Sequence, residues 1–192
     1  MNRLIARLRG SLLAAGLSCL PFLWSMGTAS AVVTYSYSGN NFTTVVDWPS
    51  VGGAYSNSMS VSGSMALGAP LAPNLLNQGI APLSFSFTDG RNTLTHASSF
   101  FSQSFYVSTN ALGDLTNWSI YLQTPLNIEP IRVILSSNDG SLVLDQGSIV
   151  PFAGSADSAE TAQPGIWNLV PEPSTTALLA AGLMLATFKR IK

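Results

Sequence analysis

The central part of the sequence predicts an all-β domain, an antiparallel β-sandwich of about seven to nine strands. Polar and apolar residues alternate with a period of two from 55 to 67, and the even positions there are five serines and one alanine. This period places successive side chains on opposite faces of a strand. No stretch between 32 and 169 shows the sustained spacing of three and four that is typical of a helix packed on a core. Residues 32–169 are therefore expected to form one β-sandwich body with serine-rich outer faces.

Further strands are expected along this body from the same alternation. Asp139-Gly140 lies between two apolar runs, a pattern typical of a tight hairpin. The apolar pattern fades from 154 to 164, and 165–169 is expected to be the last strand. The other segments expected to be strands are 33–37, 83–87, 101–107, 118–122, 131–135 and 142–144.

Glycine and proline mark the expected connections between these strands. Gly63 divides the segment 55–67, which is expected to be one half-buried strand or a strand pair bent at that glycine. Residues 69–82 contain three prolines and predict a loop or a short helical turn. Turns are also expected at Gly39-Asn40-Asn41, Asp89-Gly90 and Leu112-Gly113-Asp114.

The first 31 residues predict a secretory signal peptide. Arginines at 3, 7 and 9 precede an apolar stretch from 12 to 24, and Ala29-Ser30-Ala31 has the small residues of a cleavage site at Ala29 and Ala31. The exported chain is then expected to begin at Val32. An uncleaved anchor is the alternative, disfavoured because Pro21 interrupts the apolar stretch; a lipoprotein site at Cys19 is weaker still.

The last segment, 170–192, predicts a sorting and membrane-retention signal. Pro171, Glu172 and Pro173 hold the backbone extended, since each proline fixes its own φ and restricts the residue before it. A transmembrane helix is expected at about 174–188, although this run is shorter than the roughly 20 residues that span a bilayer. A buried terminal helix is the alternative. Basic residues on one side of a span favour the cytoplasm, which would leave the body outside; here they are Lys189, Arg190 and Lys192.

This arrangement of Pro-Glu-Pro, apolar span and basic end resembles the PEP-CTERM sorting signal of bacterial surface proteins. Pro171, Glu172 and Pro173 match the tripeptide, and the resemblance covers only the tail. It implies that an exosortase, a membrane-embedded cysteine protease, recognises and processes the tail. It also implies a host that makes extracellular polysaccharide. The segment from Tyr35 to Phe42 is similar to the exported N-terminus of other such proteins.

The charge of the body excludes one class of partner. Between 32 and 170 the chain has eight acidic residues, two arginines and no lysine, a formal charge of −6. Nucleic acid is therefore not an expected partner, because binding to its phosphates requires clustered basic residues. Cys19 is the only cysteine, so the exported chain would have no disulfide and no thiolate metal site.

The body offers few residues for catalysis, and no catalytic residue, cofactor or metal site is predicted. His96 is the only histidine and no Gly-x-Ser-x-Gly motif occurs, which disfavours a serine hydrolase and a zinc site. His96 is expected on a solvent-facing strand or loop. A calcium site using Asp139 and Asp145 stays open, with ordinary turn aspartates as the alternative. A glycosidase would need two carboxylates within about 10 Å in a cleft; the candidates are Asp89, Asp114, Glu129, Asp139 and Asp145.

Aromatic residues give the one indication of ligand binding. Trp118 alternates in phase with Ile120 and Leu122, so it is expected in the core. Trp48 lies beside Pro49 and a Gly52-Gly53 turn, and is the best candidate for an exposed ring that stacks on a sugar.

The sequence therefore predicts a non-enzymatic surface or extracellular-matrix protein. It would be exported through the inner membrane, held there transiently by a single span, and released to the cell surface or medium after processing by an exosortase-type protease. The alternative is a carbohydrate-binding module that retains exopolysaccharide at the cell surface, motivated by Trp48 and an expected acidic face.

Overall fold

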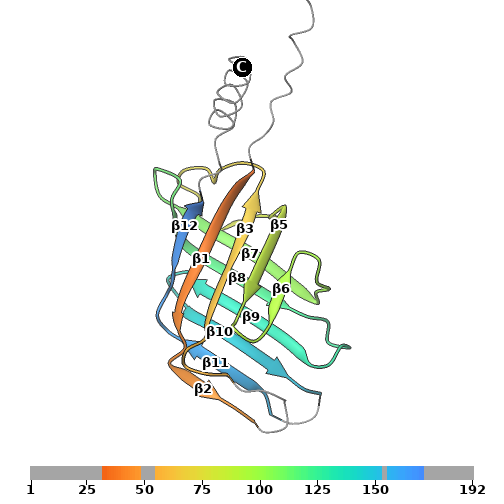
Figure 1. The fold of residues 1–192 in the computed structure, drawn as a ribbon. Coiled ribbons are helices and arrows are strands. Elements are labelled where there is room, and N and C mark those ends of the chain that lie inside the picture. The colour runs from red at the N-terminus through yellow and green to blue at the C-terminus, as the bar shows by residue number, and fades with distance from the viewer. Residues whose placement is uncertain (1–31, 49–54, 153–154, 171–192) are drawn as a thin grey trace, which may run out of the picture. The chain divides into compact units, whose positions relative to one another are not determined.

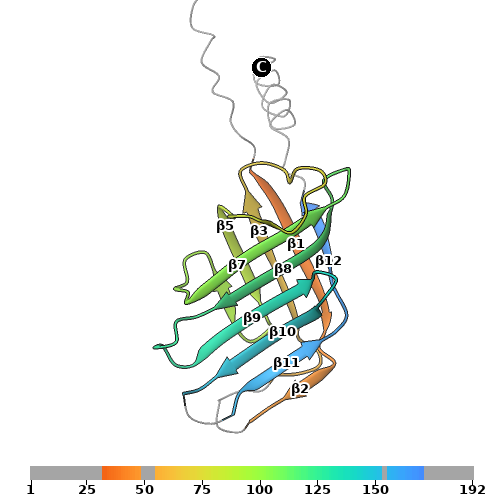
Figure 2. The same cartoon turned by 180° about the vertical axis from the view of Figure 1, so that it is seen from behind.

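The computed structural model describes residues 32–48, 55–152 and 155–170, and all regular elements within them are strands. They form two antiparallel sheets (Figures 1 and 2). The first sheet has five strands in the order β12 (Ile166–Val170), β1 (Val33–Asn41), β3 (Ser60–Leu67), β5 (Ser84–Thr88) and β6 (Thr93–Thr95). The second has seven, in the order β2 (Thr44–Val46), β11 (Asp157–Thr161), β10 (Val143–Val150), β9 (Ile131–Asn138), β8 (Leu115–Gln123), β7 (Ser102–Thr109) and β4 (Gln78–Gly79).

The all-β class and the two antiparallel sheets agree with the predicted sandwich, but the strand number does not. The described residues contain twelve strands. Nine of these have five residues or more, whereas β2, β4 and β6 have two or three. A strand that short makes backbone hydrogen bonds without an alternating side-chain pattern, so periodicity could not reveal it.

The structure decides between the two expectations for Gly63 and corrects the one for Gly39. Gly63 lies within a single strand and does not bend a strand pair: β3 begins at Ser60, later than the expected residue 55, and runs through Gly63, which pairs with Tyr37 on one side and Phe87 on the other. A Cβ atom at Gly63 would lie 2.5 Å from Cδ1 of Phe87, so this glycine makes room for the phenyl ring. Gly39, expected in a turn, lies inside β1, which is irregular between Ser38 and Asn41.

Other connections agree with the sequence. Gly90, Gly113 and Gly140 have φ of 87°, 86° and 89°, a left-handed conformation that suits glycine in turns. The Asp139-Gly140 hairpin joins β9 to β10 as predicted. Residues 69–82 are a loop apart from the two residues of β4.

Strand β11 is an element that the sequence did not predict. It lies in the stretch where the apolar pattern fades, and its inward residues are Asp157, Ala159 and Thr161. These alternate with outward Ser158 and Glu160. The period of two is present, but it alternates between polar or small residues and therefore gives no hydrophobic signal.

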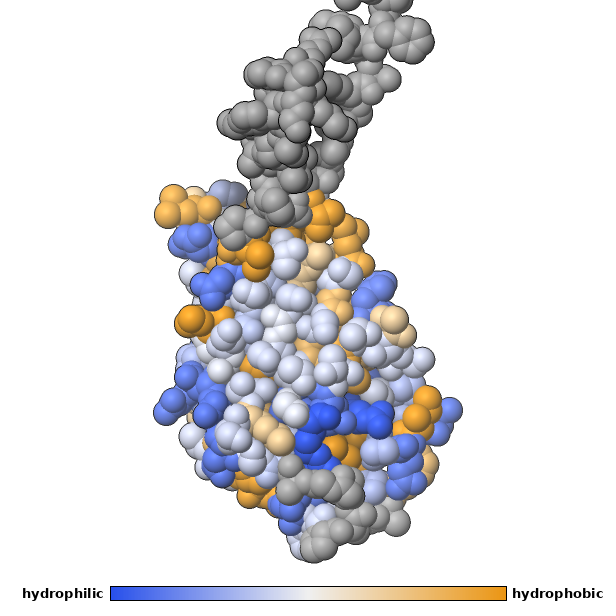
Figure 3. All heavy atoms as spheres, in the orientation of Figure 1, coloured by the Kyte–Doolittle hydropathy of each residue, from blue (hydrophilic) through white to orange (hydrophobic). Residues whose placement is uncertain are grey.

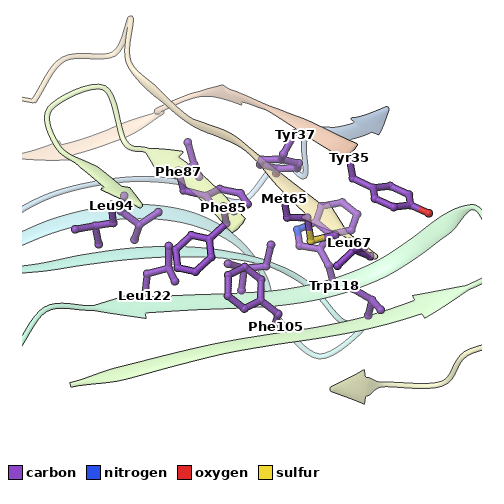
Figure 4. Close-up of a cluster of buried hydrophobic side chains, with 14 of the residues drawn as sticks. Tyr35, Tyr37, Met65, Leu67, Phe85, Phe87, Leu94, Phe105, Trp118 and Leu122 are labelled. Atoms are coloured by element: carbon purple, nitrogen blue, oxygen red, sulfur yellow. The ribbon is translucent and has the colours of Figure 1, made fainter. Parts of the chain in front are cut away.

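The core lies between the two sheets and is rich in aromatic rings. Figure 4 shows Phe85, Phe87 and Phe105 gathered with Leu94 and Leu122. The Phe85 and Phe105 ring centroids are 5.0 Å apart. Trp118 is 5% exposed and packs edge-on against Tyr37, which confirms its predicted place in the core.

The outer face of the five-stranded sheet carries rows of hydroxyl groups. One row across the strands is Ser36, Ser64, Ser86 and Thr95, and a parallel row is Ser38, Ser62, Thr88 and Thr93. Neighbouring strands lie about 4.8 Å apart, so these hydroxyls are regularly spaced in each row. Pale, weakly polar residues accordingly cover much of this face in Figure 3. The predicted serine-rich outer face is present on this sheet.

The first and last strands lie side by side. Thr34 of β1 pairs with Val170 of β12, so the described chain enters and leaves at the same end of the same sheet (Figure 1). Hydrophobic side chains gather at this end in Figure 3. The exposed apolar residues there include Val32, Leu83, Leu112, Leu169 and Val170, of which Leu112 is 83% exposed.

Candidate functional site

The predicted targeting residues lie outside the described part of the chain. This applies to Ala29 and Ala31 of the signal peptide and to the whole of 171–192. That segment includes Pro171, Glu172, Pro173, the predicted helix 174–188 and the basic residues Lys189, Arg190 and Lys192. Among the residues that are described, no helix has the length and apolar character that crossing a membrane requires.

Trp48 is exposed, as predicted, with 47% of its surface accessible. It follows β2, and its backbone N–H donates a 2.7 Å hydrogen bond to Oδ1 of Asp157. The backbone of Trp48 is therefore held by a buried carboxylate while its ring remains available. No ring contact of Trp48 with another described aromatic residue is present.

Asp157 links Trp48 to an arginine. Its Oδ2 lies 2.9 Å from Nη1 of Arg91, in an ion pair whose side chains are 0% and 10% exposed. The guanidinium carbon of Arg91 also lies 4.8 Å from the centre of the Tyr55 ring, a cation–π geometry. A buried carboxylate requires such partners, because removing a charge from water costs several kcal/mol.

Asp89 is the second buried aspartate and holds the turn after β5. Its carboxylate accepts hydrogen bonds from Tyr55 Oη at 2.7 Å and from the backbone N–H groups of Arg91 and Asn92 at 2.8 and 2.6 Å. The side-chain amide of Asn92 donates a further bond of 3.2 Å. Burial, reinforced by the Asp89 charge, raises the pKa of Tyr55. Tyr55 therefore acts as a hydrogen-bond donor and not as a base.

The third buried aspartate is Asp145 on β10. Tyr37 Oη lies 2.9 and 2.8 Å from its two carboxylate oxygens and accepts a bond of 2.9 Å from the backbone N–H of Gly165. Burial raises the pKa of Asp145 to about 6, although hydrogen bonds from Ser136 and Tyr37 lower it. Burial together with the Asp145 charge raises the pKa of Tyr37. This pair joins β1 of one sheet to β10 of the other.

A glycine of the opposite sheet faces each of two buried aspartates. A Cβ atom at Gly39 of β1 would lie 2.5 Å from Oδ2 of Asp145. A Cβ atom at Gly147 of β10 would lie 2.5 Å from Cβ of Asp89. Neither aspartate could retain its position beside a larger residue, so the two glycines are part of the same arrangement.

The expected acidic face is only partly correct, because three of the aspartates that would contribute to it are buried. Asp89, Asp145 and Asp157 are 0%, 1% and 0% exposed, so three of the eight acidic residues of the body are interior. Sequence reasoning missed them because it treated each aspartate as a turn or surface residue. The one available signal was the period of two, in which Asp145 is in phase with Gly147 and Ile149.

Two of the acidic residues considered for calcium have different partners. The carboxylate of Asp139 accepts bonds from the backbone N–H groups of Ser141 and Leu142 within its own turn, whereas that of Asp145 accepts a bond from Tyr37. No group of three or more histidine, cysteine, aspartate or glutamate side chains that could hold a metal occurs among the residues described. His96 is exposed in a turn, as predicted, and contacts the Phe85 ring edge-on.

A surface pocket of about 470 Å³ lies between β6 of the five-stranded sheet and the β8–β9 connection of the other. We call it the arginine pocket, because Arg91 and Arg132 both line it. Its volume is within the range of small-ligand sites. The polar residues that matter most in its wall are Arg91, Asn92, Thr93, Ser98, Thr124 and Arg132. Sequence analysis did not predict this site.

The pocket is connected to Trp48 through the buried residues. Arg132 Nε donates a 3.1 Å bond to Oδ1 of Asn92, and the amide of Asn92 donates to Asp89. Arg91 then links Asp89 and Tyr55 to Asp157, which holds the backbone of Trp48. One hydrogen-bonded network therefore runs from the predicted binding residue to the pocket wall.

The chain was compared with protein families, curated proteins and solved structures. No family model, curated protein or solved structure matches the chain.

Proposed function

We propose that the chain is a non-enzymatic exported protein of the cell surface or extracellular matrix, sorted by an exosortase-type protease. The observation that carries the proposal is the order of three segments: the signal-peptide pattern, a β-sandwich body, and Pro171-Glu172-Pro173 before an apolar run with a basic end. Pro171 directly follows the last residue of β12. The tail would pass the inner membrane once, with the body outside.

The pairing of β1 with β12 supports this arrangement. Thr34 lies opposite Val170, so both predicted targeting segments join the body at one end of one sheet. Exposed apolar residues, including Val32, Leu112 and Leu169, surround that end. An end of this composition suits a position next to a membrane before release.

The three buried aspartates support a structural and not a catalytic use of the acidic residues. Each carboxylate already accepts hydrogen bonds from a tyrosine, an arginine or backbone N–H groups. A general acid or base must be able to reach the proton it transfers. Asp89, Asp145 and Asp157 are enclosed between the sheets instead.

Mass spectrometry of surface and medium fractions tests the proposal. Processed molecules are expected to begin at Val32 and to lack the residues that follow the Pro-Glu-Pro motif. Glu172→Ala and Pro173→Ala should leave export intact and block release. Pro164→Ala is the matched control, because Pro164 is an exposed proline outside the motif and only its backbone oxygen bonds Asn40. Release of Glu172→Ala at the normal rate would exclude sorting through this motif.

Carbohydrate binding is a second proposed function, favoured by the exposed Trp48 ring and the hydroxyl rows on the five-stranded sheet. Tryptophan stacks on the apolar face of a sugar ring, and hydroxyl rows can exchange hydrogen bonds with a polymer. Fluorescence titration with the exopolysaccharide of the host is expected to show a shift that Trp48→Ala removes. Phe101→Ala is the control, since Phe101 is an aromatic residue that is 62% exposed elsewhere.

A further inference from the structure

We propose that the arginine pocket binds a hydroxyl-rich ligand through one anionic group, a carboxylate or a phosphate. The inference specifies the ligand class for the proposed carbohydrate-binding function and rests on it. It begins from charge: between 32 and 170 the chain has two basic residues, Arg91 and Arg132, and both line this one pocket. In a body with eight acidic residues, this is where the two positive charges meet.

The compensating carboxylates lie behind the pocket wall. Asp89 and Asp157 are each 0% exposed and approach Arg91 and Asn92 from the interior. Arg91 is paired with Asp157, the one ion pair formed among the described residues. Arg132 has no carboxylate within ion-pair distance in that part of the chain, so its positive charge remains to be matched.

The guanidinium of Arg132 is oriented in advance. Its Nε is fixed by Oδ1 of Asn92, and Asn92 is itself fixed by Asp89. A guanidinium has five N–H donors in a rigid plane, so the four on its terminal nitrogens can serve an external acceptor. Two parallel bonds to a carboxylate or phosphate are the geometry for which arginine is suited. Prior orientation reduces the entropy lost on binding.

The neighbouring hydroxyl groups can donate to the same ligand. Oγ1 of Thr124 accepts the backbone N–H of Arg132, and Oγ of Ser98 accepts that of Thr95. Because each of these oxygens already accepts a bond, its own proton can donate toward the pocket. Thr93 and Ser99 add two exposed hydroxyls. Leu94, Pro125 and Ile128 supply apolar surface, which a sugar ring also requires.

Calorimetric titration of the purified protein tests the inference with four probes: oligogalacturonate, neutral oligogalactose, glucose 6-phosphate and inorganic phosphate. We expect acidic saccharide to bind more tightly than the neutral one, and higher salt to weaken it. Arg132→Gln should reduce its affinity about 10- to 100-fold, the value of a charge-assisted hydrogen bond. Arg132→Lys should recover part of the loss, because it restores charge without the planar donor pair. Comparing oligogalacturonate with glucose 6-phosphate separates carboxylate from phosphate.

Folding and binding effects are distinguishable in these variants. Arg132→Gln retains the backbone bond to Thr124, and its melting temperature should stay close to that of the unsubstituted protein. Thr93→Val is a second variant, because Thr93 is exposed and its removal takes away one hydroxyl without touching the arginines. A modest loss of affinity in Thr93→Val supports the same pocket even if Arg132→Gln folds poorly. Unchanged affinity in both variants overturns the inference.

The outcomes also separate this inference from the carbohydrate-binding proposal. Neutral saccharide binding that is lost in Trp48→Ala and retained in Arg132→Gln overturns the anionic pocket while leaving carbohydrate binding in place. Inorganic phosphate binding that depends on Arg132, without binding of any saccharide, supports an anion site and overturns the saccharide ligand. Binding of none of the four probes overturns the anionic pocket, whereas carbohydrate binding is overturned only if the exopolysaccharide of the host also fails to bind.

Discussion

The two halves of the seven-stranded sheet present different chemistry to the core. Strands β7 and β8 contribute mainly apolar residues, whereas β10 and β11 contribute aspartates and small residues. The inward residues of the first half are Phe105, Val107, Thr109, Trp118, Ile120 and Leu122, and those of the second half are Asp145, Gly147, Ile149, Asp157, Ala159 and Thr161. Apolar burial is non-directional and tolerates repacking, but buried charge requires specific partners.

The apolar and polar halves contribute differently: the first to the net stability of the fold, the second to the specific fit of the two sheets. Burial of phenylalanine and tryptophan rings stabilises the sandwich in proportion to area. A buried ion pair such as Arg91–Asp157 contributes little net stability, although breaking it is costly. The polar half therefore fixes how the two sheets fit together, through Tyr37–Asp145 and Arg91–Asp157.

The core packed against the apolar half should show the largest single effect. Phe87 of β5, in the opposite sheet, is 0% exposed, with its ring fitted over Gly63 and near Phe105 of β7 and Trp167. Phe87→Ala is expected to lower the free energy of unfolding by about 3–5 kcal/mol, because it leaves a cavity. Urea denaturation measures this change. Phe101→Ala, at an exposed ring, should stay within about 0.5 kcal/mol.

In the polar half, removing one partner of the Arg91–Asp157 ion pair should lower the free energy of unfolding by a similar amount. Removing both partners should lower it less. Arg91→Met leaves Asp157 buried without its cation and should cost about 3–5 kcal/mol. The double variant Arg91→Met with Asp157→Leu removes both charges, so it should be more stable than Arg91→Met alone. Urea denaturation of the single and double variants provides the comparison. A double variant at least as unstable as Arg91→Met would show that the ion pair is not the cause.

These halves also differ in how far the sequence could predict them. Strands β7 and β8 of the apolar half follow apolar alternation, and Trp118 was placed in the core for that reason. Strand β11 was missed because its inward residues are Asp157, Ala159 and Thr161. Hydrophobic periodicity reports burial only where the buried residues are apolar.

The candidate site was less predictable than the fold. The exposure of Trp48 was predicted from its neighbouring turn residues, and the structure bears it out. The arginine pocket was not predicted, since Arg91 and Arg132 are 41 positions apart, Arg91 in the β5–β6 turn of one sheet and Arg132 on β9 of the other. Only the packing of β6 beside the β8–β9 connection brings them together.

The Tyr37–Asp145 pair gives the polar half a pH dependence. The pKa of Asp145 is raised from 3.8 to about 6, so the folded state retains a proton that the unfolded state has lost. The resulting stabilisation is complete below pH 3.8 and is lost as the pH rises through about 6. The difference corresponds to at most about 3 kcal/mol.

Asp145→Asn should remove this dependence, because the amide accepts the Tyr37 bond and does not titrate. As the pH is raised from 4 to 6.5, the free energy of unfolding of the unsubstituted protein should fall relative to that of Asp145→Asn. Asp139→Asn is a control of opposite sign. Hydrogen bonds from Ser141 and Leu142 lower the pKa of Asp139, so its contribution is lost as the pH falls. Parallel pH profiles for the unsubstituted protein and Asp145→Asn would contradict the prediction.

The smallest effect is expected at Trp48, where the polar half reaches the surface. The 2.7 Å bond to Asp157 comes from the backbone N–H, which Trp48→Ala retains, and the ring is 47% exposed. Trp48→Ala should therefore change the free energy of unfolding by no more than about 0.5 kcal/mol. Trp48→Pro removes the N–H as well and leaves a buried carboxylate oxygen without its donor, so it should cost about 1–3 kcal/mol more. Equal destabilisation by both variants would mean that the ring, and not the backbone bond, stabilises this end of the network, and that Trp48 is not available for a ligand.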